Sequence, residues 1–405
     1  MSFGIALGGL NAASTQLDVV SNNIANVNTT GFKSSRANFS DVFAGGGSGG
    51  NTSVGGGVKL SSVSQQFGSG SIDFTQNNLD FAIKDEGFFV LEGNNGNVYS
   101  RAGSFNLDNS GYVVDSSANR LQVFPPNSSG TGFVTGQTVD LQLQTTLSNP
   151  VATTDAEIGV NLPANQSPPP AAPFDPTQSD TYNFSTSTTV YDSLGASHFV
   201  DLYYVKDAGA NNWNTYTYID NTDMTPGATS LQFDSFGAQT APAGGTFTLG
   251  HTPSNGSQPL NVTFDYNATT QFGDTFSINN LDPNGAPSGR LSGLEVDDSG
   301  AVAARFTNGQ LQNLGQIVLA NFPNPQGLSQ LGDTTWGESF QSGSVRVGVG
   351  GTSDFGTIVS GALESSNVNL TEQLVEMISA QRNFEANAQV ISTADAITQQ
   401  IINIR

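Results

Sequence analysis

The N-terminal segment, residues 1–28, reads MSFGIALGGLNAASTQLDVVSNNIANVN. Its apolar residues recur every seven positions in two series, offset from one another by three residues. The first series is Phe3, Leu10, Leu17 and Ile24, and the second is Ala6, Ala13, Val20 and Val27. These are the a and d positions of a coiled-coil helix. Residues 1–30 are therefore predicted to form one helix that presents an apolar seam to a partner.

The C-terminal end of the chain has a similar heptad pattern. One series of apolar residues is Leu370, Met377, Phe384 and Ile391, and the adjoining series is Leu374, Ala388 and Ile402. Asn369, with Glu372 three residues later, has the pattern of a capping box that begins a helix. Residues 359–405 are predicted to form the second helix. Each helix could pack only on its own domain, but their positions at opposite ends of the chain, each separated from the middle by a Gly/Ser tract, argue against that interpretation.

The middle of the chain has a different pattern. Two glycine- and serine-rich tracts, Gly45–Gly57 and Gly343–Gly356, have the composition of linkers. Between them, apolar residues come in short strand-like runs such as 316–322. Asp108–Gly111 and Asp297–Gly300 have the Asp and Gly residues of tight hairpin turns. The predicted fold class is multidomain, with a terminal α-helical coiled coil and β-rich, mainly antiparallel middle domains.

Proline-rich sequence at 149–176 and a Pro and Gly cluster at 282–289 indicate an inserted domain. We predict five parts, which are an N-terminal helix, a linker region, a discontinuous β-rich domain, an inserted outer β domain and a C-terminal helix. In that order they cover residues 1–30, 31–70, 71–145 plus 285–358, 146–284 and 359–405.

Composition excludes several classes of partner. The 405 residues carry a formal charge of -22, which repels nucleic acid and anionic membrane surfaces. No apolar run reaches the roughly 20 residues that span a bilayer, so membrane insertion is not expected. The first cation is Lys33, so the N-terminus has no basic signal-peptide region, and export without a cleavable signal peptide is expected.

Few residues suggest chemistry. The chain has no cysteine and only two histidines, His198 and His251, which we interpret as structural histidines on a strand face or in a loop. The segment starting at Asn106 resembles a calcium loop but has Ser117 where that loop requires glutamate. The glycines at 45–50 lack the flanking residues of a phosphate-binding loop. The expectation is no catalytic residue, no cofactor, no metal and no enzyme activity.

Two segments near the termini resemble a known family. The string Ser21–Lys33, SNNIANVNTTGFK, resembles the N-terminal signature of flagellar rod and hook proteins. Ser366–Leu370, followed by Gln381 and Arg382, resembles the C-terminal signature of the same family. The signature residues are Asn22, Asn23, Ala25, Asn26, Gly31, Phe32, Gln381 and Arg382.

Within that family, the length, the insertion and the run 314–322 resemble hook members. The resemblance implies a flexible tube of many identical copies, in which paired terminal helices surround an export channel and β domains lie outside. Such a tube acts as a universal joint between rod and filament. Implied partners are the distal rod, hook cap and hook–filament junction proteins and the flagellar export machinery, and the implied location is the extracellular hook. A distal rod protein and a β-rich secreted adhesin are the alternatives.

The N-terminal helix has one charged residue, Asp18, and mostly small apolar side chains. Burial of these side chains does not offset the conformational entropy that is lost when the isolated helix forms. Both terminal regions are therefore expected to be disordered in the free monomer and to fold during assembly.

Overall fold

The computed structural model describes residues 2–42, 55–128, 130–143, 147–224, 227–352 and 354–403. The side chains of the last helix are described as far as residue 400, so Ile402 of the predicted C-terminal series lies outside them. The chain forms two compact units. Unit 1 comprises residues 1–143, 293–304 and 311–405, and unit 2 comprises residues 144–292 and 305–310.

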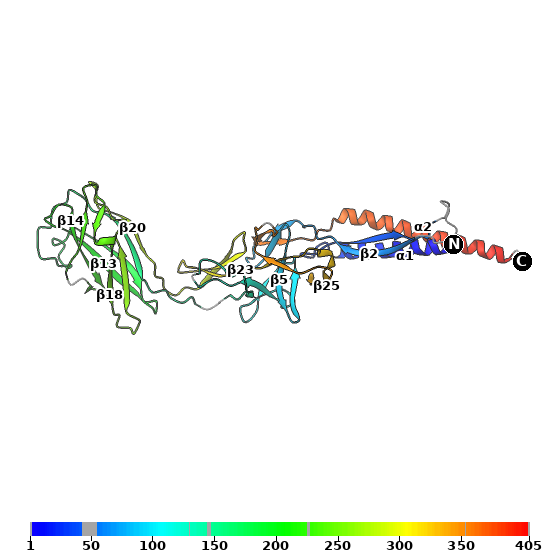
Figure 1. Ribbon diagram of the computed structural model, residues 1–405, viewed down its shortest axis with the longest axis horizontal. Coiled ribbons are helices and arrows are strands. Elements are labelled where there is room, and N and C mark those ends of the chain that lie inside the picture. Colours follow the sequence, from blue (N-terminus) through cyan, green and yellow to red (C-terminus); the bar gives the residue numbers. More distant parts are fainter. Residues whose placement is uncertain are drawn as a thin grey trace. The chain divides into compact units, whose positions relative to one another are not determined.

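Two long helices at the ends of the chain lie side by side in unit 1 (Figure 1). They are α1 (Ser2–Ala25) and α2 (Leu370–Asn403). The helices are antiparallel, because Asn23 near the end of α1 bonds to Gln373 near the start of α2. Within the described residues, neither helix has the length and apolar content needed to cross a membrane.

A two-stranded ribbon of β1 (Ser35–Asp41) and β2 (Val58–Gln65) packs against α1. Both strands fall in the range 31–70 that the sequence assigned to a linker. Residues 43–54, which hold most of the Gly45–Gly57 tract, lie outside the described residues.

The β part of unit 1 is built around a 13-stranded sheet with the main order β21-β22-β23-β9-β5-β6-β26-β25. Residues of β5 alternate between two cores, with Phe89 and Leu91 in one and Phe88 and Val90 in the other. Because successive side chains of a strand point to opposite faces, both faces of β5 are covered. The second predicted tract, Gly343–Gly356, includes strand β27 of the same sheet.

The strands of this sheet are β5 (Phe88–Gly93), β6 (Gly96–Ser100), β7 (Asn106–Leu107), β8 (Val113–Val114), β9 (Arg120–Phe124), β10 (Val139–Asp140), β21 (Leu291–Val296), β22 (Ala301–Phe306), β23 (Leu311–Ile317), β24 (Leu319–Asn321), β25 (Ser329–Gly332), β26 (Thr335–Gly337) and β27 (Arg346–Gly348). Two separate pairs join β3 (Ile72–Phe74) to β29 (Ala362–Glu364) and β4 (Phe81–Lys84) to β28 (Thr357–Ser360). A short 3-10 helix, η2, spans Pro325–Gly327.

Unit 2 is a sandwich of a four-stranded and a six-stranded sheet, ordered β18-β19-β11-β20 and β12-β13-β14-β16-β17, with β15 paired to β14. Side chains of both sheets, such as Ile158, Leu202 and Trp213, form one core. The elements are β11 (Asp155–Asn161), β12 (Phe184–Tyr191), β13 (Ser197–Lys206), β14 (Asn212–Ile219), β15 (Thr222–Asp223), β16 (Thr229–Phe233), β17 (Gln239–Ala241), η1 (Ala243–Gly245), β18 (Thr246–His251), β19 (Leu260–Asp265) and β20 (Ser277–Pro283).

The predicted fold class is confirmed, with terminal helices around a β-rich and mainly antiparallel middle. The predicted hairpin turns also form. The backbone N–H groups of Ser110 and Tyr112 each donate to Asp108 Oδ1 at 2.8 Å. Ser299 and Ala301 donate in the same way to Asp297 Oδ1. This arrangement explains the Asp and Gly residues at both turns.

Candidate assembly site

The paired terminal helices are the candidate assembly site. Small residues let α1 approach its neighbours closely, since a Cβ at Gly9 would lie 2.5 Å from Asn387 Oδ1 of α2. A Cβ at Gly8 would lie 3.0 Å from the Val58 carbonyl oxygen of β2. The buried apolar side chains of α1 are Ala6, Ala13 and Val20, which belong to the second heptad series. This series faces the inside of the subunit.

The first heptad series and its counterpart on α2 are more exposed. Phe3 is exposed, and Leu10, Leu17 and Ile24 are half-buried. On α2, Leu370 and Leu374 are each 45% exposed, whereas Met377, Phe384 and Ile391 are half-buried. Within one subunit these predicted seam residues therefore keep much of their apolar surface accessible.

A stripe of large apolar side chains on the two helices is exposed. Its members, which we call the exposed helix stripe, are Phe3, Leu7, Leu370, Leu374, Val375, Ile378, Val390 and Ile397. Among the α2 side chains described at 370–400, only Ala380 is buried. Phe3 and the segment 389–398 also line a groove of about 610 Å³. One subunit thus leaves α2 largely uncovered.

Residues of the two signature segments connect the end of α1 to the start of α2. The Asn23 side chain is buried and donates to the Ser35 carbonyl oxygen at 2.8 Å and to Gln373 Oε1 at 2.9 Å. Its Oδ1 accepts the Ser35 N–H at 2.8 Å. The start of α2 is capped by Asn369, whose Oδ1 accepts the Thr371 N–H at 3.1 Å and the Glu372 N–H at 3.4 Å, so the N-cap part of the predicted capping box is confirmed.

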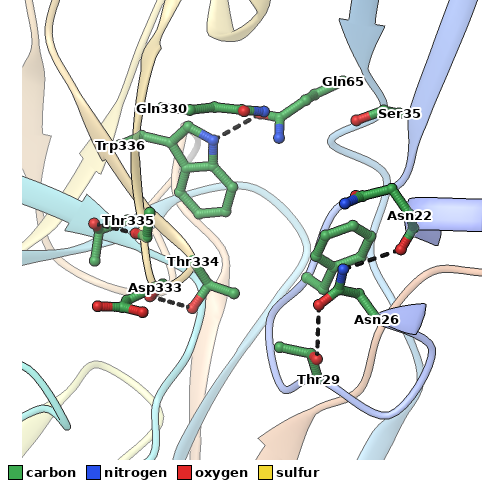
Figure 2. A pocket seen from close by; sticks show the side chains of 12 residues that line it. Asn22, Asn26, Thr29, Ser35, Gln65, Gln330, Asp333, Thr334, Thr335 and Trp336 are labelled. Carbon is green, nitrogen blue, oxygen red and sulfur yellow. Dashed lines mark hydrogen bonds between the residues drawn. The ribbon is translucent and has the colours of Figure 1, made fainter. Parts of the chain in front are cut away.

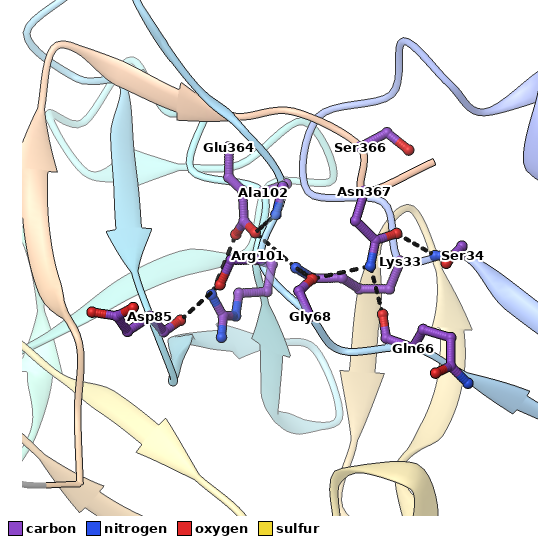
Figure 3. Close-up of polar contacts among 12 residues, drawn as sticks. Lys33, Ser34, Gln66, Gly68, Asp85, Arg101, Ala102, Glu364, Ser366 and Asn367 are labelled. Atoms are coloured by element: carbon purple, nitrogen blue, oxygen red, sulfur yellow. Dashed lines mark hydrogen bonds and ion pairs between the residues drawn. The ribbon is translucent and has the colours of Figure 1, made fainter. Parts of the chain in front are cut away.

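A buried ion cluster lies between the N-terminal signature segment and the strand that precedes α2 (Figure 3). The Glu364 carboxylate accepts from Lys33 Nζ at 2.7 Å and from Arg101 Nη1 at 3.3 Å. It also accepts the Gly70 N–H at 2.8 Å. Burial lowers the pKa of Lys33 and of Arg101, and the Glu364 carboxylate opposes this shift in both. The cluster connects the N-terminal signature to the strand that precedes α2.

Gly31 has a left-handed backbone conformation with φ of +69°. Its N–H donates to the Glu364 carbonyl oxygen at 2.8 Å. A Cβ here would lie 2.4 Å from the Ala102 nitrogen. Helix α1 ends at Ala25, so Gly31 serves the turn after the helix and its close approach to residues 101–102, not the helix end itself.

Three further signature residues, Asn22, Asn26 and Phe32, line a pocket of about 330 Å³ that also contains Trp336 (Figure 2). Trp336 Nε1 donates to Gln65 Oε1 at 2.6 Å, and Thr29 Oγ1 donates to Asn26 Oδ1 at 3.2 Å. The pocket therefore offers amides, hydroxyls and one indole. The remaining signature residues, Ala25, Gln381 and Arg382, are exposed.

Sequence reasoning missed Glu364 and Arg101. Lys33 was visible as the first cation of a chain with only 12 Lys and Arg residues, but its partner is 331 residues away. The sequence also contained no sign that His198 and His251 are neighbours, whereas the centroids of their rings lie 5.7 Å apart.

Models of four flagellar families match the chain in order. They are described as flagella basal body rod protein at 3–33, flagellar hook protein FlgE/F/G D1 domain at 82–166, flagellar basal body protein FlaE D2 domain at 161–286, and flagellar basal body rod FlgEFG protein C-terminal at 359–404.

Relatives match over the whole length. The chain is 39% identical to the flagellar hook protein FlgE of Escherichia coli, with 100% of both chains covered. It is 31% identical to that of Borreliella burgdorferi, with 98% of both covered. A crystal structure of the Helicobacter pylori flagellar hook protein FlgE2 has a similar fold, with a TM-score of 0.52, 14% identity, and coverage of 72% of this chain and 100% of that one.

These relatives are named hook proteins, which favours a hook protein over the distal rod alternative. The family is a structural one. The chain belongs to the flagellar hook protein family, and it is a structural subunit of the bacterial flagellar hook.

Proposed function

We propose that copies of this chain polymerise into the hook tube by burying the exposed helix stripe against α1 and α2 of neighbouring copies. The main support for this proposal is that most side chains of α2 are not buried within one subunit. A helix with one buried residue among 370–400 and six large exposed apolar side chains gains most of its burial from other subunits.

Charge supports apolar burial as the driving force. Copies with a formal charge of -22 repel one another, so attraction between them must come from contacts that exclude water. A pair of helices so little buried has low stability alone. The terminal regions then fold as they add to a growing end, which limits polymerisation to that end.

By similarity to the family, the proposed role is a curved, flexible tube with a central export channel that transmits torque from rod to filament. The proposed partners at its ends are the distal rod, hook cap and hook–filament junction proteins. Copies are proposed to reach the growing end through the flagellar export machinery. The role is mechanical, and no enzymatic step is proposed.

Deletion of residues 1–30 or of residues 366–405 tests the proposal. Each truncated chain is expected to remain monomeric in sedimentation velocity at concentrations where the full chain forms tubes, while unit 2 keeps its β circular dichroism. Hook-like tubes from either truncation, seen by negative-stain electron microscopy, would contradict it.

A further inference from the structure

The only two histidines of the chain meet in unit 2. His198 is on β13 of the six-stranded sheet and His251 ends β18 of the four-stranded sheet. Their ring centroids are 5.7 Å apart. Two different sheets therefore bring the two imidazoles together.

A carboxylate completes the group. Asp220 follows β14 with a φ of +48°, and its Oδ1 accepts the Phe199 N–H at 3.1 Å. Its Oδ2 lies 2.6 Å from His198 Nδ1. One ligand atom from each of His198, Asp220 and His251 lies within 4.8 Å of the other two. Ligands bound at about 2.0–2.2 Å around one tetrahedral ion are roughly 3–4 Å apart, so small side-chain shifts suffice.

A second carboxylate orients His198 from behind. Asp192 is fully buried, and its Oδ2 lies 3.3 Å from His198 Nε2. The backbone N–H groups of Leu194 and Ala196 hold its Oδ1 at 2.9 Å, and Asn255 donates to its Oδ2. When an ion displaces the Nδ1 proton that bonds to Asp220, an Nε2–H donated to Asp192 would hold the ring with its Nδ1 lone pair directed at the ion. This is the carboxylate–histidine–metal arrangement that supports metal ligands in proteins.

We propose that His198, His251 and Asp220 form a binding site for Zn²⁺, with Asp192 as the residue that positions His198. Two imidazoles and one carboxylate suit a borderline ion such as Zn²⁺ or Co²⁺ better than Mg²⁺ or Ca²⁺, which prefer oxygen ligands. The ion would join the two sheets of unit 2 at the ends of β13, β14 and β18. The competing arrangement is a metal-free one, in which a protonated His198 lies between Asp220 and Asp192 and His251 is not needed.

Titration of the metal-free full-length chain with ZnCl₂ in an isothermal calorimeter tests the proposal. The expected result is one site per chain with a micromolar or tighter Kd, not displaced by millimolar Mg²⁺. His251→Gln and Asp220→Asn should each weaken binding at least tenfold. Asp282→Asn, which removes an exposed carboxylate elsewhere in unit 2, should leave Kd unchanged and controls for diffuse binding to an acidic chain.

A readout on the unaltered chain makes the test independent of variant folding. Because the chain has two histidines, its imidazole NMR spectrum contains two sets of signals, and Zn²⁺ should shift both. Co²⁺ should give visible d–d absorption that Zn²⁺ abolishes. Three results would overturn the proposal. They are the absence of a stoichiometric site, displacement of Zn²⁺ by Mg²⁺, and equal affinity of the His251→Gln variant and the original chain, which would favour the metal-free arrangement.

Discussion

Gly31 is constrained by both conformation and space. Its φ of +69° is unfavourable for any residue with a Cβ, and an added Cβ would meet the backbone at residues 101–102. We expect Gly31→Ala to destabilise unit 1 by about 2 kcal/mol or more. Unfolding in urea is measured by hydrogen–deuterium exchange. Because exchange is read peptide by peptide, it reports the stability of unit 1 and of unit 2 separately.

Gly4→Ala in α1 is the matched control, since a Cβ added there would have no neighbouring atom within 4 Å outside the helix's own backbone. Because α1 is proposed to fold only during assembly, this change should leave the stability of the free chain within about 0.5 kcal/mol of the original. Equal stability of the two variants would remove the special role of Gly31.

Glu364 neutralises two buried cations, so its removal leaves both without a carboxylate. We expect Glu364→Gln to cost about 3–5 kcal/mol of stability, because Lys33 and Arg101 then stay buried next to a neutral amide. Arg346→Gln removes the exposed ion pair with Asp354 and should cost less than about 1 kcal/mol. Similar losses in both variants, measured by the same exchange experiment, would argue against a structural role for the cluster.

At the scale of elements, the exposed helix stripe separates assembly from folding. Ile378 is 50% exposed in the subunit, so Ile378→Asp should leave the monomer's stability within about 0.5 kcal/mol of the original. Tube formation should be lost, because the change would bury an unpaired charge between copies. Turbidity and electron microscopy of concentrated protein measure this.

Ile378→Leu is the control, since it keeps apolar surface at the same position and should assemble. If Ile378→Asp polymerised as well as Ile378→Leu, this part of α2 would not lie in an interface between copies.

The sequence predicted the helices but not which of their faces serves the single chain. Heptad spacing identifies apolar series, yet it does not distinguish a seam within the subunit from one between subunits. The small residues Ala6, Ala13 and Val20 are buried inside, while the larger Leu374 remains exposed. Strands β1 and β2 escaped prediction because they are mostly half-buried or exposed and lack a clear alternation of apolar and polar residues.

Contacts between distant segments were also beyond prediction. Lys33 and Glu364, or His198 and His251, are joined by topology, and neither pair has a local spacing that reveals it. By contrast, the turns at Asp108 and Asp297 and the cap at Asn369 depend on neighbours within four residues and were predicted correctly.

In the whole molecule, we expect that unit 2 can be replaced at the place where its two ends meet. Ser148 and Gly289 are joined by two hydrogen bonds of 2.8 Å, so the two chain segments entering and leaving the sandwich lie together. Replacing residues 150–287 with a short Gly/Ser turn should therefore leave unit 1 folded. We expect the shortened chain to form tubes whose curvature is lost or altered, as electron micrographs would show.

Failure of the shortened chain to form any tube, with unit 1 still folded by hydrogen exchange, would place unit 2 in the assembly core. Tubes with unchanged curvature would instead deny unit 2 a mechanical role.

A cryo-electron microscopy map of tubes grown from the full chain would reveal whether the terminal helices make the polymer. We expect α1 and α2 to form the innermost layer around the channel, with Leu374, Val375 and Ile378 packed against helices of other copies. A map in which these side chains face solvent, while contacts between copies are made only by the β-rich parts, would contradict the proposed assembly.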